Sequence, residues 1–308
     1  MPARKKRLRS YKARKEKKKN LLPFFLIILL LGSLLFYILA TSPFWDGKSK
    51  LSLVINTKDE EVIVSTYDPT TSEIINIYIP GDTEVELSRN LGKIRIKNAW
   101  AVGLNQGEEG VILLETVRRN FKFPVFAWAD GQASGFSQTN LRALFSAAFT
   151  PYRTNLKIGD RVALAIFAIG IKNAKREDID LRDTSFLQEA TLVDGRSGYT
   201  LTGKFPQSLL VVLGDEEISS EEVTVSIVDA TGDFEVSSYL TSIIEVMGAK
   251  VVSIEKNPVQ AYDCEIEGTN KEIVEKIAKV FECSASNIEV KGNFDIVIKV
   301  GEDFASRF

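Results

Sequence analysis

The residues best suited to chemistry in this sequence follow an apolar run, in IINIYIPGDTEVEL at positions 74–87. Pro80 and Gly81 end the run, and Asp82 and Thr83 then present a carboxylate and a hydroxyl group. Because ligands of α/β proteins bind at the ends of strands, this turn is a candidate active site. A plain turn in which Asp82 caps the backbone explains the same residues equally well.

Histidine is absent from all 308 residues. Ser-His-Asp and Cys-His catalysis and histidine metal sites are therefore excluded, together with the commonest general base at neutral pH. Any chemistry has to come from carboxylates, from Lys and Arg, or from a metal ion that carboxylates bind.

Three further groups of residues have the right types but weaker patterns. The acidic runs at 59–61 and 108–109 would suit Mg²⁺, but such runs are usually solvated turns or helix starts. Arg118 and Arg119 would suit a phosphate, although a helix end favours basic residues in any case. Gly232 follows an expected strand and opens an expected helix, where N–H groups receive anions, but a lone glycine is a weak signal.

The charge of the chain is unevenly distributed. The whole sequence has 39 Lys and Arg against 41 Asp and Glu, whereas its first 20 residues hold 11 Lys and Arg against the single acid Glu16. The rest therefore has 28 basic and 40 acidic residues, a net charge of −12. An acidic body argues against nucleic acid as its main partner.

Residues 21–40, LLPFFLIILLLGSLLFYILA, form an uncharged and mostly apolar run. Twenty helical residues at ~1.5 Å each cover the ~30 Å core of a bilayer. A buried helix or a cleaved signal peptide, with Ala40 near the cleavage site, are the alternatives. We expect a retained transmembrane helix at 21–42, and the basic tail at 1–20 places the N-terminus in the cytoplasm. The remaining domains would then be extracytoplasmic, on a single-pass protein of the cell membrane.

The elements around the candidate turn read as alternating strands and helices. DPTTSE suits a hairpin turn, with Asp68 and Pro69 in its first two positions. We expect strands at 50–56, 61–67, 74–79 and 124–129, and helices at 108–120, 139–148 and 158–171.

The last third of the chain reads as a separate and smaller α/β unit. An acidic, polar stretch at 214–222 is the expected linker before it. Thr269 and Glu272 have the spacing of a capping box, and Gly248 suits a helix end. We expect strands at 223–229, 250–255, 260–267, 288–290 and 295–300, with helices at 235–247 and 269–281, a split βαβ (βαββαβ) arrangement.

The two cysteines flank the second of these helices. If the strand at 260–267 returns antiparallel to the helix, Cys264 and Cys283 meet, and a bridge over this loop is worth about 3 kcal/mol. Two free buried thiols are the alternative.

Several segments resemble the LytR–CpsA–Psr (LCP) family of bacterial envelope proteins. VTVSIVDATG (223–232), VSSYLTSIIEVMGAKVVSIEK (236–256) and IVIKVGEDF (296–304) resemble the LytR-type C-terminal domain. More faintly, VIVSTYDPTTSEIINIYIPGDTEVEL (62–87), GKIRIKNAWAVG (92–103) and GVILLETVRRNFKFPVFAWAD (110–130) resemble the catalytic domain. The resemblance implies an α/β fold with an LCP-like α/β/α domain at 50–213 and a small C-terminal domain at 223–301.

The resemblance also implies a function. Members of the family transfer glycopolymers from a polyprenyl-pyrophosphate lipid to the cell wall, with arginines that clamp the pyrophosphate and an acidic residue that works with Mg²⁺. Gly81 stands where the family has an arginine before Asp82 and Thr83, and Glu61 or Val62 stands near a second arginine position. The stretch DGQASGFSQTN leaves only Arg142 nearby.

We therefore expect a degenerate LCP-like domain in a cell-envelope protein that binds or scaffolds wall polymer or partner proteins, with no cofactor. Asp82 is a weak catalytic candidate, and Thr83, Arg95 and Arg142 are weak ligand-binding candidates. The alternative is an active glycopolymer transferase, with Mg²⁺ and a rearranged set of cations drawn from Arg89, Lys93, Arg95 and Arg142. A transcriptional attenuator is a third and weaker interpretation.

Overall fold

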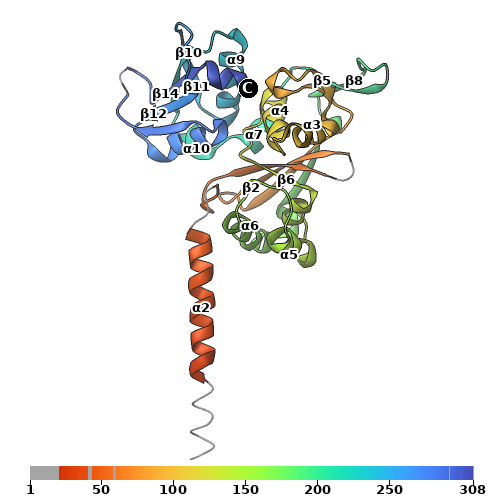
Figure 1. Ribbon diagram of the computed structural model, residues 1–308, viewed down its shortest axis with the longest axis vertical. Helices are drawn as coiled ribbons and strands as arrows, with labels where there is room; N and C mark the ends of the chain where they lie inside the picture. The colour runs from red at the N-terminus through yellow and green to blue at the C-terminus, as the bar shows by residue number, and fades with distance from the viewer. Residues whose placement is uncertain (1–20, 41–43, 58–59, 291, 308) are drawn as a thin grey trace, which may run out of the picture.

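The computed structural model describes residues 21–40, 44–57, 60–290 and 292–307. Two five-stranded sheets lie side by side in the body, and one helix, α2 (Leu21–Ala40), leaves the body at one end (Figure 1). The basic tail at 1–20 and the acidic residue Asp59 lie outside the described residues.

The first sheet has the strand order β6-β1-β2-β3-β7. Its centre is an antiparallel meander of β1 (Leu51–Asn56), β2 (Val62–Asp68) and β3 (Glu73–Ile79). The outer strands β6 (Ala127–Asp130) and β7 (Arg176–Asp180) run parallel to β1 and β3 respectively. The predicted hairpin turn is present, because the Asp68 carboxylate accepts the N–H groups of Thr70 and Thr71.

Helices cover both faces of this sheet, and this explains why all seven residues of β2 are buried. Strand residues such as Val64 and Ile77 pack on α3 (Ala99–Gln106) and α4 (Val111–Phe121). Leu53 and Ile55 point to the other face, towards η3 (Gly131–Phe136), α5 (Leu141–Phe149) and α6 (Ile158–Gly170). The remaining elements of this part are β4 (Glu84–Glu86), η1 (Ser88–Asn90), β5 (Lys93–Arg95), η2 (Ile96–Asn98), η4 (Asn173–Lys175), η5 (Leu181–Asp183), β8 (Leu187–Thr191) and β9 (Ser197–Leu201).

The second sheet has the order β11-β10-β14-β12-β13 and its own hydrophobic core. Its elements follow the chain as β10 (Thr224–Ala230), α9 (Phe234–Met247), β11 (Lys250–Lys256), β12 (Cys264–Gly268), α10 (Lys271–Phe281), β13 (Ser284–Asn287), β14 (Ile296–Gly301) and α11 (Glu302–Arg307). The mixed α/β prediction is confirmed. Two details differ, because Asn270 caps α10 in place of Thr269, and the strand expected at 288–290 lies at 284–287.

Cys264 and Cys283 are joined by a disulfide, with an S–S distance of 1.99 Å and a Cα–Cα distance of 5.0 Å. The bridge ties the start of β12 to the segment that follows α10. Ser284 Oγ also donates a hydrogen bond to the carbonyl oxygen of Cys264 at 2.9 Å.

The expected linker at 214–222 is itself structured. It contains α8 (Glu216–Ser220), which follows α7 (Gln207–Leu213), and Ile218 is part of the core beneath the second sheet. Lys50 Nζ donates hydrogen bonds to the carbonyls of Val212 and Gly214 at 2.8 and 2.6 Å. Arg118 on α4 also pairs at 3.1 Å with Glu282, which follows α10, so helices that belong to the two sheets are linked by an ion pair. The domain boundaries given above remain predictions.

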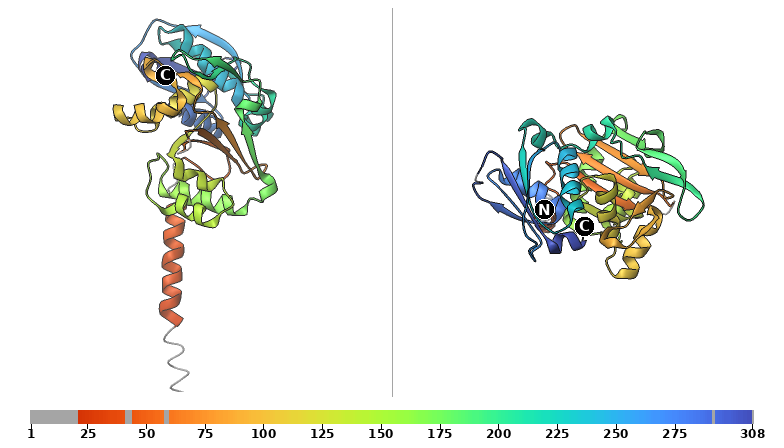
Figure 2. Two further views of the ribbon diagram at one scale, coloured as in Figure 1. Left: turned by 90° about the vertical axis from the view of Figure 1, so that its right-hand side faces the viewer. Right: turned by 90° about the horizontal axis from the view of Figure 1, so that it is seen from above.

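The membrane topology expected from the sequence requires a correction. Within the described residues, no helix has both the length and the apolar character needed to cross a membrane. In α2, the described side chains are those of residues 23–34, 36 and 37. The prediction of one membrane-spanning helix with a cytoplasmic N-terminus is contradicted by this finding. In the structure α2 packs against α6 where it joins the body (Figure 2).

Candidate functional site

The turn that carries Asp82 is held from three sides by backbone hydrogen bonds. The N–H of Thr83 donates to the carbonyl of Pro80 at 3.0 Å and closes the turn. The N–H of Ile96 then donates to the Thr83 carbonyl at 2.8 Å, and the N–H of Tyr199 to the Asp82 carbonyl at 3.1 Å. The end of β3 is therefore fixed against both small hairpins, and the turn is a rigid part of the fold.

Gly81 is packed directly against the backbone of Glu60. A Cβ atom on Gly81 would lie 1.6 Å from the Glu60 carbonyl oxygen and 3.0 Å from Cβ of Lys97. No larger side chain fits at this position without a shift of the backbone. The resemblance matches Gly81 to an arginine position. In this chain that position has no guanidinium group, and the backbone around it leaves no room for one.

The Asp82 carboxylate belongs to an alternating chain of charges that runs Glu60–Lys97–Asp82–Arg95–Asp194. Asp82 Oδ1 lies 2.6 Å from Arg95 Nη1 and 3.1 Å from Lys97 Nζ. Arg95 Nε also contacts Asp194 at 2.9 Å, and Lys97 contacts Glu60 at 2.5 Å. Three carboxylates thus neutralise two cations, and the cluster has no cationic capacity left for a doubly negative ligand.

The pKa values in this chain of charges agree with a set of paired ions. The hydrogen bond from Arg95, followed by that from Lys97, lowers the pKa of Asp82 below its ordinary value. Hydrogen bonds to Asp194 and then Asp82 raise the pKa of Arg95, and bonds to Glu60 and then Asp82 raise that of Lys97. Asp82 is therefore held as a carboxylate at neutral pH, and 47% of its side chain is exposed.

The other candidate residues do not join this cluster. Thr83 is fully buried, and its hydroxyl has no hydrogen-bond partner among the described residues. Arg142 is exposed on α5, on a different part of the molecule. Arg89 is engaged by Glu115 and Glu108, both at 2.9 Å. A single guanidinium group, that of Arg95, therefore contacts Asp82 among the described residues.

The two remaining motifs have structural explanations. Arg118 and Arg119 are buried on α4 and pair with Glu282 and Glu86. Gly232 has a left-handed φ of 76° in the turn before α9. Within the part of the chain that the structure describes, no three Asp, Glu or Cys side chains are grouped to hold a metal ion.

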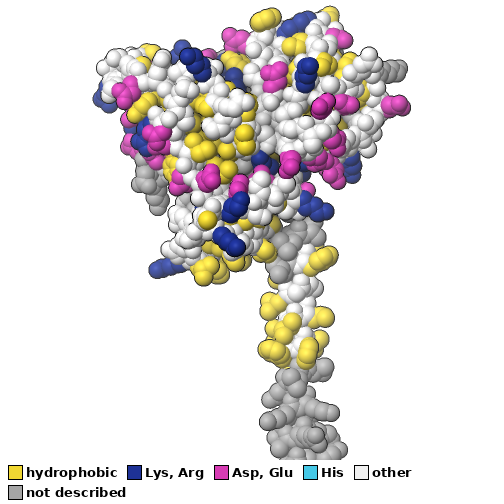
Figure 3. Space-filling model, turned by 180° about the vertical axis from the view of Figure 1, so that it is seen from behind, with side chains coloured by type: hydrophobic (Ala, Val, Ile, Leu, Met, Phe, Trp, Pro, Cys, Tyr) yellow, Lys and Arg dark blue, Asp and Glu magenta, His cyan; other side chains and the backbone are white. Residues whose placement is uncertain are grey.

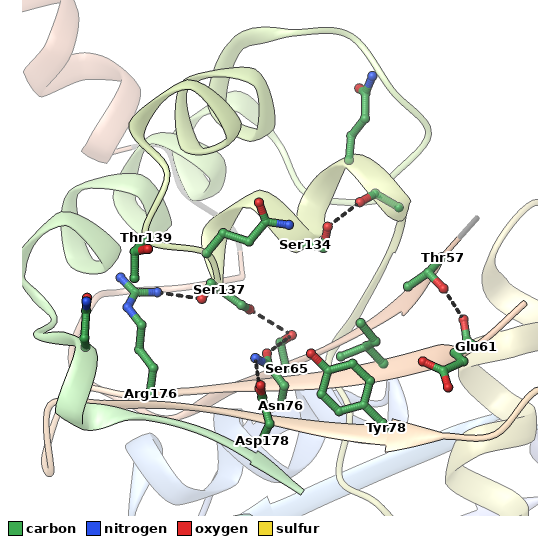
Figure 4. A pocket seen from close by; sticks show the side chains of 15 residues that line it. Thr57, Glu61, Ser65, Asn76, Tyr78, Ser134, Ser137, Thr139, Arg176 and Asp178 are labelled. Atoms are coloured by element: carbon green, nitrogen blue, oxygen red, sulfur yellow. Dashed lines mark hydrogen bonds between the residues drawn. The ribbon is translucent and has the colours of Figure 1, made fainter. Parts of the chain in front are cut away.

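A cleft of about 670 Å³ lies apart from the Asp82 turn, on the face of the first sheet that η3 covers (Figure 4). Its floor is formed by alternate residues of β2, β3 and β7, because successive side chains of a strand point to opposite faces. The lining residues are Thr57, Glu61, Ile63, Ser65, Asn76, Tyr78, Gly131, Gln132, Ser134, Ser137, Gln138, Thr139, Asn173, Arg176 and Asp178.

A connected row of polar groups crosses the floor of this cleft. Ser137 donates to Ser65 Oγ at 3.1 Å, and Ser65 donates to Asn76 Oδ1 at 2.8 Å. Asn76 Nδ2 in turn donates to Asp178 Oδ1 at 2.8 Å (Figure 4). The row fixes the orientation of the Asn76 amide, because both ends of that amide are engaged.

Arg176 is the one basic residue among those that line the cleft, and both terminal nitrogens of its guanidinium group are bonded to backbone carbonyls. Nη1 donates to the carbonyl of Ser137 at 2.8 Å, and Nη2 donates to the carbonyl of Ala168 at 2.6 Å. Burial lowers the pKa of Arg176 from its ordinary value. The side chain therefore acts as a brace that holds η3 and α6 to β7.

The charges of the cleft make it acidic. Glu61 and Asp178 contribute two carboxylates to the lining against the internally bonded Arg176, and Glu61 is also paired with Arg182, which lies outside the lining, at 3.3 Å. Partial burial, followed by the charges of Asp178 and Glu61, raises the pKa of Tyr78, so its hydroxyl stays protonated. The sequence analysis did not identify this site. The available signal was the placement of the polar residues Ser65 and Asn76 inside two strands that are otherwise largely apolar.

No family model and no curated protein matches the chain. Solved structures do resemble it at the level of the chain trace. TagT of Bacillus subtilis is 14% identical over 53% of this chain and 88% of its own, with a TM-score of 0.37. TagV of the same organism is 14% identical over 50% of this chain and 91% of its own, with a TM-score of 0.36.

A third structure, of the LytR-CPS2A-psr family protein YwtF (TagT), contains bound octaprenyl pyrophosphate lipid. It is 15% identical over 53% of this chain and 88% of its own, with a TM-score of 0.37. Each of these three structures covers about half of this chain, and the third is named as a member of the LytR-CPS2A-psr (LCP) family. The resemblance noted from the sequence is thus confirmed, at low identity and partial coverage, and the function has to be judged from the residues of this chain.

Proposed function

We propose that this chain is a non-catalytic binding protein of the cell envelope whose cleft holds the neutral, hydroxyl-rich part of a wall glycan. The cleft offers the chemistry that a sugar requires. Sugar hydroxyls both donate and accept hydrogen bonds, and the lining supplies hydroxyl, amide and carboxylate groups in quantity. Tyr78 and Ile63 add apolar surface for the carbon face of a ring.

The observation that carries this proposal is that the two cations in contact with Asp82 and the one basic residue that lines the cleft already have partners within the protein. Arg176 is bonded to backbone carbonyls, and Arg95 and Lys97 are neutralised by carboxylates. Clamping a pyrophosphate requires guanidinium forks that are free to form charge-assisted hydrogen bonds. A neutral glycan needs no cation for binding, and its hydroxyl groups can donate hydrogen bonds to the carboxylates of Glu61 and Asp178.

The test is calorimetry on the purified full chain with two probes, a neutral N-acetylglucosamine oligosaccharide and a short-chain polyprenyl pyrophosphate. We expect the oligosaccharide to bind and the pyrophosphate to bind more weakly or not at all. The double variant Q132A/N173A removes two exposed amides from the rim of the cleft and should weaken oligosaccharide binding about three- to tenfold. The matched control is Q188A, an exposed amide on β8 outside the cleft.

The second candidate function is an active glycopolymer transferase. One observation favours it, the ionised and half-exposed Asp82 carboxylate at a strand end between two cations. The test is D82A in a transfer assay that joins a lipid-linked glycan to an acceptor glycan. Loss of transfer together with loss of pyrophosphate binding in D82A would establish this function in place of the first. Absence of transfer in the wild-type chain would exclude it.

A further inference from the structure

Helices α5 and α6 expose an apolar face. Leu141, Phe145 and Phe149 are spaced four residues apart on α5, so they share one side of the helix. Their exposed fractions are 70, 67 and 52%. On the adjoining α6, Ile166 and Ile169 are 52 and 65% exposed. Large apolar side chains grouped in this way mark a surface that contacts another apolar body.

The charge of the same helices is opposite to that of the rest of the body. Residues 139–175 hold six Lys and Arg against one acidic residue, Asp160, while the other residues from 21 onwards hold 22 basic and 39 acidic ones. Asp160 is fully buried, where its carboxylate accepts the N–H groups of Phe44 and Trp45. The α5–α6 face is therefore a cationic region on an acidic protein.

Four basic side chains on or next to α5 and α6 are available to a ligand. They are exposed on or beside α5 and α6, and no ion pair is found for them among the described residues: Arg142, Arg153, Lys157 and Lys172. Double-stranded nucleic acid would use the charges but not the apolar side chains, and the aliphatic Leu141, Ile166 and Ile169 offer no stacking surface to single-stranded bases. A purely apolar partner would use the apolar side chains but not the charges. An anionic lipid surface uses both, since apolar side chains enter the boundary between headgroups and acyl chains while basic ones meet the headgroups.

The position of the face agrees with a lipid partner. Helix α2 leaves the body at the end where α5 and α6 lie (Figure 1), and apolar and basic side chains gather at that end (Figure 3). The large side chains described on α2 are apolar and exposed, among them Phe25 at 66% and Phe36 at 75%. Two apolar surfaces thus lie next to each other at one end of the molecule.

We propose that the α5–α6 face docks on an anionic lipid surface, with Leu141, Phe145, Phe149, Ile166 and Ile169 entering the headgroup boundary and the four basic residues contacting lipid phosphates. Docking of this kind is a surface contact, and it depends on neither the cleft's ligand nor an active site. Because α5 packs against η3, which lines the cleft, docking also holds the cleft close to the lipid surface.

The experiment uses a tryptophan as a local depth probe in the full chain. The variant F145W is mixed with vesicles of phosphatidylglycerol or of phosphatidylcholine, with brominated acyl chains that quench nearby tryptophan emission. The three native tryptophans are buried, between 2 and 8% exposed, and the wild-type chain supplies their background. The control V193W places the probe on an 81% exposed side chain in the β8–β9 turn, away from α5 (Figure 1).

We expect brominated phosphatidylglycerol to quench F145W but not V193W, and phosphatidylcholine to quench F145W much less. Adding R142Q and K157Q to F145W should shift the equilibrium between the docked and free face about 25-fold, at about fivefold for each basic residue. Equal quenching of F145W and V193W, or no quenching of F145W by either lipid, would overturn the proposal. Self-association of the chain in lipid-free sedimentation runs, with the F145W probe shielded from a soluble quencher, would also overturn the proposal. It would identify the face as a contact between copies of the chain.

Discussion

Gly81 and Glu60 are in backbone contact, so closely that a Cβ atom on the glycine would lie 1.6 Å from the carbonyl oxygen of Glu60. The contact is fixed from the other side as well, because the N–H of Lys97 donates to the Gly81 carbonyl at 3.2 Å. The backbone around Gly81 therefore leaves no room for an arginine side chain at this position. A single substitution would not restore a cationic grip here without moving the turn.

Replacement of Gly81 by alanine should destabilise the protein. The added methyl group overpacks a site bounded by backbone, and such changes cost about 1–3 kcal/mol of unfolding free energy. The control is G170A at the end of α6, where nothing lies within 4 Å of the new Cβ atom. Urea denaturation of both variants measures the difference. A G81A variant as stable as G170A would show that the turn is soft and that a side chain can enter it.

The disulfide between Cys264 and Cys283 should contribute measurably to stability. Its cysteines are 19 residues apart, and closing a loop of this length stabilises a fold by about 3 kcal/mol in the chain-entropy account. The double variant C264A/C283A should therefore show a lower denaturation midpoint than the wild type under non-reducing conditions. In a reductant that opens the wild-type bridge, the two midpoints should become equal. Equal midpoints without reductant would contradict the expectation.

The sequence predicted four of the five strands of the first sheet and did not predict the cleft, for a physical reason. The runs at 62–68 and 73–79 are rich in β-formers and are joined by Asp68-Pro69, so short-range preferences alone indicate a hairpin. The cleft depends instead on β7, whose Arg176 pairs with Ile74 across 102 positions of the chain. No local pattern determines that pairing. The Asp82 turn was recognised because its residues are contiguous, whereas its partners Arg95 and Asp194 come from separate hairpins.

Replacement of Asn76 by aspartate should make stability depend on pH through the floor of the cleft. The Asn76 amide donates to Asp178 at 2.8 Å, so N76D places two carboxylates in contact and raises the pKa of one of them. When the pKa of a carboxyl group is higher in the folded state than in the unfolded state, the unfolding free energy decreases as the pH rises above the pKa of the unfolded state.

The N76D variant should therefore be less stable than the wild type by about 2 kcal/mol at pH 7, with the deficit shrinking as pH falls towards about 4. Denaturation at a series of pH values measures this. The control is N173D at the exposed rim of the same cleft, which should be nearly neutral. A deficit for N76D that does not change with pH would show that lost hydrogen bonds, and not charge repulsion, are the cause.

Lys122 should make the protein more stable as the solution becomes alkaline. Burial, followed by the like charge of Arg119, lowers the pKa of Lys122 from 10.5 to about 7, while Glu235 acts in the opposite direction. Its ammonium group lies 3.6 Å from the centroid of the Tyr239 ring, a contact that favours the charged form in part. Because the pKa is lower in the folded state, the unfolded chain binds more protons between pH 7 and 10.5, and the unfolding free energy rises with pH across this window.

The variant K122M should remove most of this rise, and it should be the more stable protein near pH 7 by an amount on the order of 2 kcal/mol, after allowance for partial exposure. Methionine keeps the length of the side chain and has no charge to desolvate. The control K172M changes an exposed lysine and should leave the pH dependence as it is. Urea denaturation at pH 6, 8 and 10 measures the unfolding free energy of K122M and of the wild type. If the two proteins show the same pH dependence, Lys122 remains charged in the folded protein. The ring of Tyr239 and the Arg119 carbonyl, both in contact with the ammonium group, would then account for that charge.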